Sequence, residues 1–355
     1  MTTILGSFPH TTVGGRGLAS AQRPGRPHGG GIGGRHPTPA SGGSVTALVR
    51  EPIPLRHGSR PQTAGAASLA LRPLLDAPRR AARVLAVFPS AVYLETRGDR
   101  EPRVVAVVGS DANRLPNAMV VGAARRDQPF RSIREGGEAW VGDGRVEVGP
   151  LSVRVRRWWD PSPALGGMRP AELARGVRAL ETALAAAGMT GGGLAGHPDP
   201  ARLAECCAAD DLAGAVEAAE RIVGLGPGLT PSGDDILSGL LVTLRLVGAA
   251  VTGGGPAVRL ADWLGAAVTA DAGTRTTALA ATLLHFAAAG GAGGEVAAVL
   301  RGVAGHEAAA PAVRRLLAVG HTSGADLAWG VLAGCRAALA LCAPAVARQT
   351  RRASA

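Results

Sequence analysis

The sequence predicts an α+β fold, with a small, mostly antiparallel β domain followed by a compact α-helical domain. Between residues 82 and 158, short β-branched segments are bounded by turn residues, as in strands with one solvated face. After Pro161, apolar residues recur at helical spacing and glycine-rich joints separate the segments. One helical segment is repeated further along the chain, so we expect two related S-G-x-D helix starts in the helical domain.

The chain has 355 residues, of which 46% are hydrophobic, and this is enough for one large or two smaller cores. Residues 1–65 are rich in Gly, Pro and Arg and lack helical or strand periodicity, so we expect a disordered extension. We assign residues 66–160 to the β-rich domain, 161–346 to the α-helical domain and 347–355 to a basic tail.

The net charge of +11 does not indicate a nucleic-acid-binding protein, because the excess lies at the two ends of the chain. Residues 1–60 carry seven arginines and one acidic residue, and the basic tail adds further arginines. The four cysteines form no C-x-x-C motif, and no long uninterrupted apolar run is present. We therefore expect a cytoplasmic protein that binds neither nucleic acid nor membrane.

The β segments come first. They read RVLAVFPSAVYLE at 83–95, RVVAVVGS at 103–110, NAMVVGA at 117–123 and RVEVGPLSVRVRRWW at 145–159. In the last of these, valines alternate with charged residues, which favours strands that have one wet face.

The helical segments follow. Pro170 suits the first turn of a helix that ends at Gly188. We expect further helices at residues 200–208, 211–223, 232–249, 256–271, 275–289, 294–304, 309–319 and 323–342. Their joints are short, so we expect neighbouring helices to pack against one another.

Residues 232–241 and 323–332 share the pattern S-G-x-D-[IL]-x-x-G-[LV]-L. Each copy suggests a helix start with Ser as N-cap, Gly at N1 and Asp235 or Asp326 at N3 in a capping box. Gly239 and Gly330 follow four residues later, and glycine inside a helix is tolerated where another backbone approaches closely. The two helices are therefore expected to cross near these glycines and to bring their starts together.

The segment GLGPGLTPSGDD at 224–235 suggests a site for an anion, since a glycine loop before a helix start offers N–H groups and a positive dipole end. In this register Asp234 does not cap the helix. A carboxylate beside an anion suggests that a cation or an N–H donor lies between them. We expect Mg²⁺ on Asp234 and Asp235. The alternative for each motif copy is ordinary helix capping without a ligand.

The candidate residues are grouped by role. Candidate catalytic residues are Asp234, Asp235, Asp326 and His321. Candidate substrate-binding residues are Gly226, Gly228, Thr230, Ser232, Gly233, Arg275, Thr276, Thr277, Ser323 and Gly324. Arg275 would clamp an anion, although a solvated arginine fits its place equally well. His321 has the alternative of a loop histidine that only forms hydrogen bonds.

Three segments of the chain resemble the family of the oxamate carbamoyltransferase subunit AllH, formerly a domain of unknown function. These segments are the glycine motif, TRTTALAATLLHFAAAG at 274–290 and GHTSGADLAWGVLAG at 320–334. The resemblance extends over about residues 75–342. It implies a subunit of a complex in purine and allantoin nitrogen catabolism, in which oxalurate and phosphate give oxamate and carbamoyl phosphate. It also implies two kinds of partner, a small anionic metabolite and the other subunits of the complex.

Two other functions fit the same residues. The chain could be a non-catalytic subunit that senses a metabolite or acts as a scaffold, or a small-molecule kinase that uses Mg-ATP. An ordinary P-loop is excluded because the chain contains no lysine.

Overall fold

The computed structural model describes residues 62–98, 101–189 and 191–342. These residues belong to one compact unit. The basic tail and residues 1–61 of the expected extension lie outside the described residues. Residues 62–65, which we assigned to the extension, are part of a strand.

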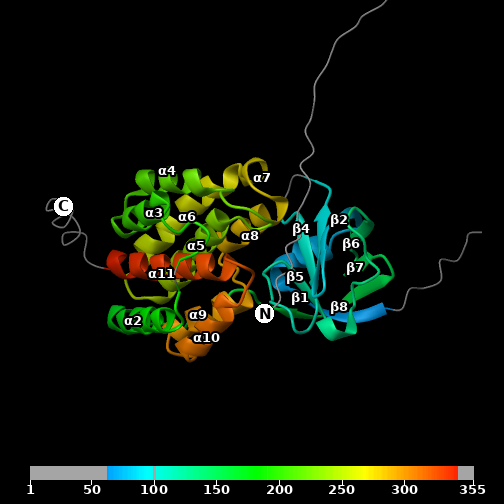
Figure 1. Ribbon diagram of the computed structural model, residues 1–355, viewed down its shortest axis with the longest axis horizontal. Coiled ribbons are helices and arrows are strands. Elements are labelled where there is room, and N and C mark those ends of the chain that lie inside the picture. Colours follow the sequence, from blue (N-terminus) through cyan, green and yellow to red (C-terminus); the bar gives the residue numbers. More distant parts are fainter. Residues whose placement is uncertain (1–61, 99–100, 190, 343–355) are drawn as a thin grey trace, which may run out of the picture. The chain divides into compact units, whose positions relative to one another are not determined.

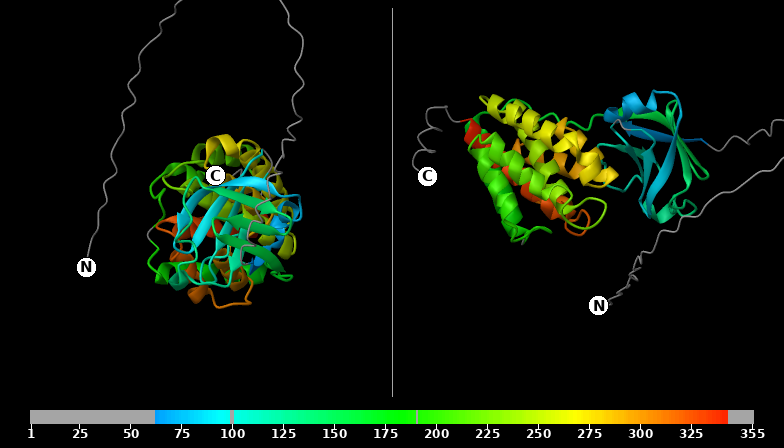
Figure 2. Two further views of the ribbon diagram at one scale, coloured as in Figure 1. Left: turned by 90° about the vertical axis from the view of Figure 1, so that its right-hand side faces the viewer. Right: turned by 90° about the horizontal axis from the view of Figure 1, so that it is seen from above.

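The β region is a closed barrel of eight strands in the order β1-β5-β4-β3-β2-β6-β7-β8 (Figure 1, Figure 2). The strands are β1 (Gln62–Ser68), β2 (Arg80–Phe88), β3 (Ala91–Thr96), β4 (Val104–Val108), β5 (Ala118–Val121), β6 (Glu138–Gly142), β7 (Arg145–Val148) and β8 (Leu151–Trp159). Pairs β1–β8 and β4–β5 are parallel, whereas the other neighbouring pairs are antiparallel.

The prediction of a small, mostly antiparallel β domain is therefore wrong, because the strands close into a barrel of mixed pairing. Closure depends on β1, whose sequence QTAGAAS has no β-branched residue except Thr63. Small residues suit this place. A Cβ on Gly65 would lie 2.6 Å from Val153 Cγ1 and 3.2 Å from the Val120 carbonyl oxygen, on the two strands that flank β1.

Strand β4 is buried along its whole length, which explains its unbroken apolar sequence VVAVV. The helical region covers it on one side: the Val104 N–H donates to the Thr282 hydroxyl at 3.2 Å, and this hydroxyl donates to Glu101 Oε2 at 2.6 Å. Phe286 from the same helix packs into the apolar cluster of the barrel. The barrel and the helices thus share a packed junction.

The helical region confirms the helices expected after Pro161. The structure contains α1 (Arg72–Leu75) within the β region, then α2 (Pro170–Ala186), α3 (Pro198–Ala208), α4 (Leu212–Ile222), α5 (Ser232–Ala250), α6 (Gly255–Ala270), α7 (Ala272–Arg275), α8 (Ala278–Ala288), α9 (Gly294–Val303), α10 (Ala309–Leu317) and α11 (Ser323–Leu341). The segment expected as one helix at 275–289 is divided between α7 and α8. The division arises because Thr277 is extended and caps α8 by accepting from the Ala280 N–H at 3.0 Å.

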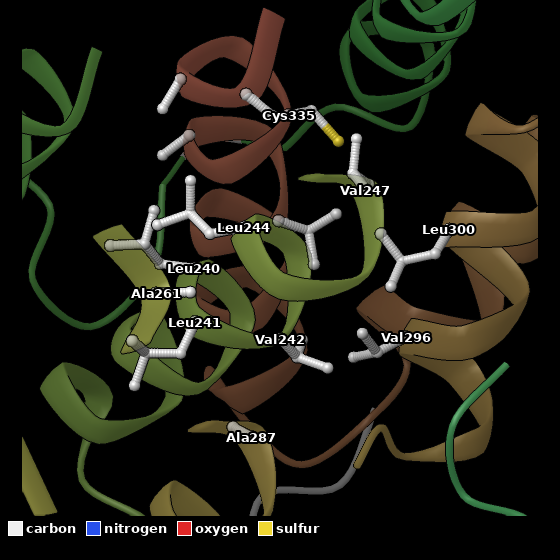
Figure 3. Close-up of a cluster of buried hydrophobic side chains, with 14 of the residues drawn as sticks. Leu240, Leu241, Val242, Leu244, Val247, Ala261, Ala287, Val296, Leu300 and Cys335 are labelled. Carbon is white, nitrogen blue, oxygen red and sulfur yellow. The ribbon is translucent and has the colours of Figure 1, made fainter. Parts of the chain in front are cut away.

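Helix α5 lies at the centre of the helical region and is buried along most of its length. Figure 3 shows its side chains Leu240, Leu241, Val242, Leu244 and Val247 among residues of other helices, including Leu300 of α9 and Cys335 of α11. Among the described residues, α11 is the one helix long and apolar enough to span a membrane, and most of that stretch is buried inside the protein. A cytoplasmic location stays a prediction.

Candidate ligand site at the starts of α5 and α11

Helices α5 and α11 pack tightly against each other, and glycines make the approach possible. A Cβ on Gly239 would collide with the Leu327 carbonyl oxygen, and a Cβ on Gly330 would collide with the Ile236 carbonyl oxygen. Ile236 and Leu327 are equivalent positions of the two motif copies, so the contact is symmetric. The expected crossing of the two helices at their glycines is confirmed.

The helix starts, residues 232–235 and 323–326, are not capped as expected. Ser232 and Ser323 are the first helical residues instead of N-caps, and neither helix has a side-chain cap. Each serine hydroxyl instead acts on the aspartate of the other helix: Ser323 lowers the pKa of Asp235, and Ser232 lowers the pKa of Asp326. Ser323 Oγ and Thr230 Oγ1 form a hydrogen bond at 3.2 Å. The capping prediction is wrong because it considered each helix alone, whereas the crossing brings the partner helix within reach.

Asp235 is the most strongly perturbed acid at this crossing. Its residue is only 5% exposed, and the hydroxyls of Ser323 and Thr230 bond with its carboxyl group. Its Oδ2 atom has no hydrogen-bond partner among the described residues. Burial, together with the nearby acid Asp326, raises the pKa of Asp235 to about 7 despite the two hydroxyls. A carboxyl group in this state can exchange a proton near neutral pH.

Asp326 has an environment similar to that of Asp235, but a chain segment covers it. Its Oδ1 accepts from the Gly193 N–H at 3.0 Å, and the hydroxyls of Ser232 and Thr322 also bond with its carboxyl group. Burial raises its pKa. A Cβ on Gly192 would collide with Asp326 Oδ1, so the 192–193 segment covers this acid closely.

Both carboxyl oxygens of Asp234 accept hydrogen bonds. Its Oδ1 accepts from the Gly224 N–H at 2.9 Å, and its Oδ2 accepts from the Thr276 hydroxyl. Burial raises the pKa of Asp234, and these bonds together with the charge of Arg275 offset that effect only in part. Asp234 therefore joins the glycine loop to the segment before α8, and both of its oxygens are already engaged.

The glycine loop does not present all the N–H groups that the sequence suggested. Gly233 N–H donates to the Leu225 carbonyl at 2.9 Å, and Gly324 N–H donates to the Val319 carbonyl at 2.9 Å. Gly226 and Gly228 are exposed and have φ angles of 122° and 94°, which L side chains rarely adopt. These glycines shape the turn that leads into α5.

Three other candidate residues have surroundings that differ from those of the aspartates. Arg275 donates to the Glu220 carbonyl and lies 3.8 Å from Asp271, which ties it to the end of α4, and its role as an anion clamp stays a prediction. The Thr277 hydroxyl donates to the Leu229 carbonyl at 2.5 Å. His321 is exposed at the loop before α11.

A cavity of about 350 Å³ lies between the barrel and the helical region. Of the candidate residues, Thr230, Asp235 and Ser323 line it. The polar residues that the sequence did not single out are Ser90, Tyr93, Asn113, Ser238 and Glu295, and the remaining lining is mostly apolar. No motif marks these five residues, because the fold brings them together from the barrel and from two separate helices.

Three unpaired oxygens are found among the residues that line this cavity. Asp235 Oδ2, Glu295 Oε2 and Asn113 Oδ1 are buried and have no hydrogen-bond partner among the described residues. Burial raises the pKa of Glu295 as well. No arginine or histidine is present among the described residues of the lining. The residues that line the cavity therefore offer hydrogen-bond acceptors to a ligand.

The expected magnesium site on Asp234 and Asp235 does not fit these contacts well. Asp234 has no free oxygen, which leaves Asp235 Oδ2 as the open ligand atom of the pair. Within the described ranges, no group of three or more His, Cys, Asp or Glu side chains could hold a metal ion. Magnesium stays a prediction.

Residues 222–335 match the family of the oxamate carbamoyltransferase subunit AllH. The match confirms the resemblance over this segment, which contains the glycine loop, both motif copies and Glu295, whereas the wider extent of 75–342 that we expected is not matched. The barrel lies outside the matched segment. No solved structure matches the chain.

Proposed function

We propose that this chain is a subunit of an oxamate carbamoyltransferase-like complex and that the cavity beside Asp235 binds its metabolite. The family match supports the first part. The observation that carries the second part is the Asp235 carboxyl group, which is buried and has one unpaired oxygen at the cavity. A buried unpaired acceptor is costly for the folded protein, and binding of a hydrogen-bond donor would offset that cost.

Oxalurate suits this acceptor through its ureido N–H groups. In the proposed reaction, a phosphate oxygen attacks the ureido carbonyl carbon, the C–N bond to the oxamate nitrogen breaks, and its electron pair goes to that nitrogen. The nitrogen then needs a proton. Because the pKa of Asp235 is raised to about 7, a fraction of the Asp235 carboxyl groups is protonated at neutral pH and could act as the general acid.

The phosphate is best assigned to another subunit. The described lining has no basic side chain, and a phosphate dianion is usually held by arginine, lysine or several free N–H groups. This observation argues for other subunits as partners and disfavours the kinase alternative, which needs a triphosphate site. It is also consistent with the alternative of a non-catalytic subunit that senses a metabolite in the same cavity.

A thermal-shift screen of the full chain tests the proposal. The ligands are oxalurate, oxamate, carbamoyl phosphate, phosphate and ATP, each with and without Mg²⁺. Oxalurate at one hundred times its Kd should raise the free energy of unfolding by about 2.7 kcal/mol. Asp235→Asn should remove most of the effect, whereas the exposed control Glu138→Gln should keep it. Stabilisation by Mg-ATP alone would contradict the proposal.

A second experiment separates an enzyme subunit from a sensing subunit. The full chain is used to capture its partners, and the formation of carbamoyl phosphate from oxalurate and phosphate is then measured with the parent chain and with Asp235→Asn. A catalytic role predicts a loss of activity of about 100-fold or more with the variant. Full activity of a complex that contains Asp235→Asn would show that this chain only binds or regulates.

A further inference from the structure

The cavity beside Asp235 has walls that suit a larger compound than oxalurate. Its volume is about 350 Å³, which is within the range of pockets that bind organic ligands of moderate size. Apolar residues from both parts of the protein form most of its surface, among them Phe88, Val108 and Leu115 from the barrel side and Val242, Leu279 and Leu327 from the helices. Oxalurate is small, so with its ureido group at Asp235 it would fill only part of this cavity, and the apolar walls leave room for a ligand with an apolar body.

The residues that line the cavity offer hydrogen-bond acceptors. Asp235 Oδ2, Glu295 Oε2 and Asn113 Oδ1 belong to lining residues, are buried and unpaired, and all three are acceptors. The charges of Arg315 and Arg114 act on Glu295, whereas the charged groups that act on Asp235 are the acids Asp326 and Asp234. An anionic group placed against Asp235 would therefore meet like charge in a desolvated environment, which is strongly unfavourable.

From these two observations we infer that the cavity binds a compound with an apolar body and a buried end that carries N–H donors and no negative charge, such as a ureido or an ammonium group. The inference rests on the proposal that this cavity is the metabolite site, and it names the class of compound that the site accepts. In this orientation the donor end lies against Asp235, the apolar body lies against the walls, and Glu295 and Asn113 are further unpaired acceptors among the lining residues.

The inference is tested with three compounds of similar size: n-butylurea, n-pentylamine and pentanoate. Binding to the full chain is measured by thermal shift and by calorimetry at pH 8. We expect butylurea or pentylamine to bind at least tenfold more tightly than pentanoate, and at ten times its Kd to raise the Tm by about 3 °C. The comparison between the urea and the amine distinguishes a neutral donor from a cation.

Two variants test whether the compounds bind in the cavity. Asp235→Asn and Glu295→Gln each replace an acceptor-only carboxylate by an amide of the same shape, and each should weaken the better ligand by about tenfold. The exposed control Glu138→Gln should leave the affinity unchanged. Equal or tighter binding of pentanoate, or no binding of any of the three compounds, would overturn the inference.

The outcomes also separate this inference from the proposed function. If oxalurate binds through Asp235 but the three compounds show no preference, the proposed function stands and the inference fails. If the donor compounds bind through Asp235 and Glu295 but no oxalurate-dependent activity is found with the partner subunits, the inference stands and the proposed function fails.

Discussion

The starts of α5 and α11 carry the same motif and pack on each other symmetrically, yet they differ in what covers them. Ser323 bonds with Asp235 across the crossing, and Ser232 bonds with Asp326 in return. Both aspartates are buried and each has an unpaired Oδ2. Asp326, however, lies under the 192–193 segment, whereas Asp235 lines the cavity.

This difference separates packing from ligand binding. The shared features, two glycines and two serine–aspartate bonds, hold the helices together and need no ligand. The feature found at one start only is an aspartate that lines a cavity, and ligand binding is expected there. The repeat is therefore mainly structural, and the departure from symmetry marks the candidate site.

The largest expected effect comes from breaking the symmetric contact. Gly330→Ala places a Cβ against the Ile236 carbonyl oxygen and 2.9 Å from the Leu240 nitrogen, so the helices must separate. We expect a loss of at least about 3 kcal/mol in the free energy of unfolding by urea. Gly167→Ala, at an exposed position where a Cβ would have no atom within 4 Å, is the control and should be neutral or stabilising. A loss below about 1 kcal/mol for Gly330→Ala would mean that the crossing adapts easily.

The next largest expected effect is a gain in the free energy of unfolding when Asp235 is substituted. Its pKa is raised from 3.8 to about 7, so the folded chain binds this proton more tightly than the unfolded chain. The resulting stability is present below about pH 4 and is lost as the pH rises towards 7. Asp235→Asn should therefore raise the free energy of unfolding by about 2 kcal/mol at pH 8 and add little at pH 4.

Measuring urea unfolding of the parent and Asp235→Asn across this pH range checks the prediction. A variant that is destabilised at pH 8 would show that the carboxylate is well satisfied in the free protein, which would argue against a ligand site. A substitution that stabilises the fold while it removes binding is typical of functional sites.

Asp234 provides a contrast within the same helix start, since we assign it a structural role. Thr276→Val removes the hydroxyl that donates to Asp234 and keeps the shape of the side chain. We expect a loss of about 1.5 kcal/mol by urea unfolding and unchanged affinity for the ligand that the screen identifies. Thr182→Val, which removes an exposed bond to the Arg178 carbonyl in α2, is the matched control and should change stability little. Loss of binding with Thr276→Val would place Asp234 in the site after all.

The smallest effects should come from the reciprocal serine bonds. Ser323→Ala and Ser232→Ala should each cost about 1 kcal/mol. Because each hydroxyl lowers the pKa of the aspartate across the crossing, Ser323→Ala should raise the pKa of Asp235 further, and Ser232→Ala should do the same for Asp326. Carboxyl NMR titration of both variants measures this. If either substitution shifted only the aspartate of its own helix, the crossed pairing would be wrong.

The sequence predicted the parts of this structure that depend on local pattern. The helices after Pro161 and the crossing at Gly239 and Gly330 follow from periodicity and from the repeat. The barrel could not be predicted, because its closure depends on β1, a segment rich in Ala and Gly that pairs with a strand far along the chain. The cavity was missed for a similar reason: Asn113 and Glu295 have ordinary sequence contexts and meet only in the folded protein.

The central claim is that Asp235, and not its symmetric counterpart Asp326, holds the ligand. The most direct test is calorimetric titration of the full chain with the tightest ligand found among oxalurate and the donor compounds, for the parent, Asp235→Asn and Asp326→Asn. We predict at least a tenfold loss of affinity with Asp235→Asn and a change of less than threefold with Asp326→Asn. Equal losses in the two variants, or a larger loss with Asp326→Asn, would contradict the account.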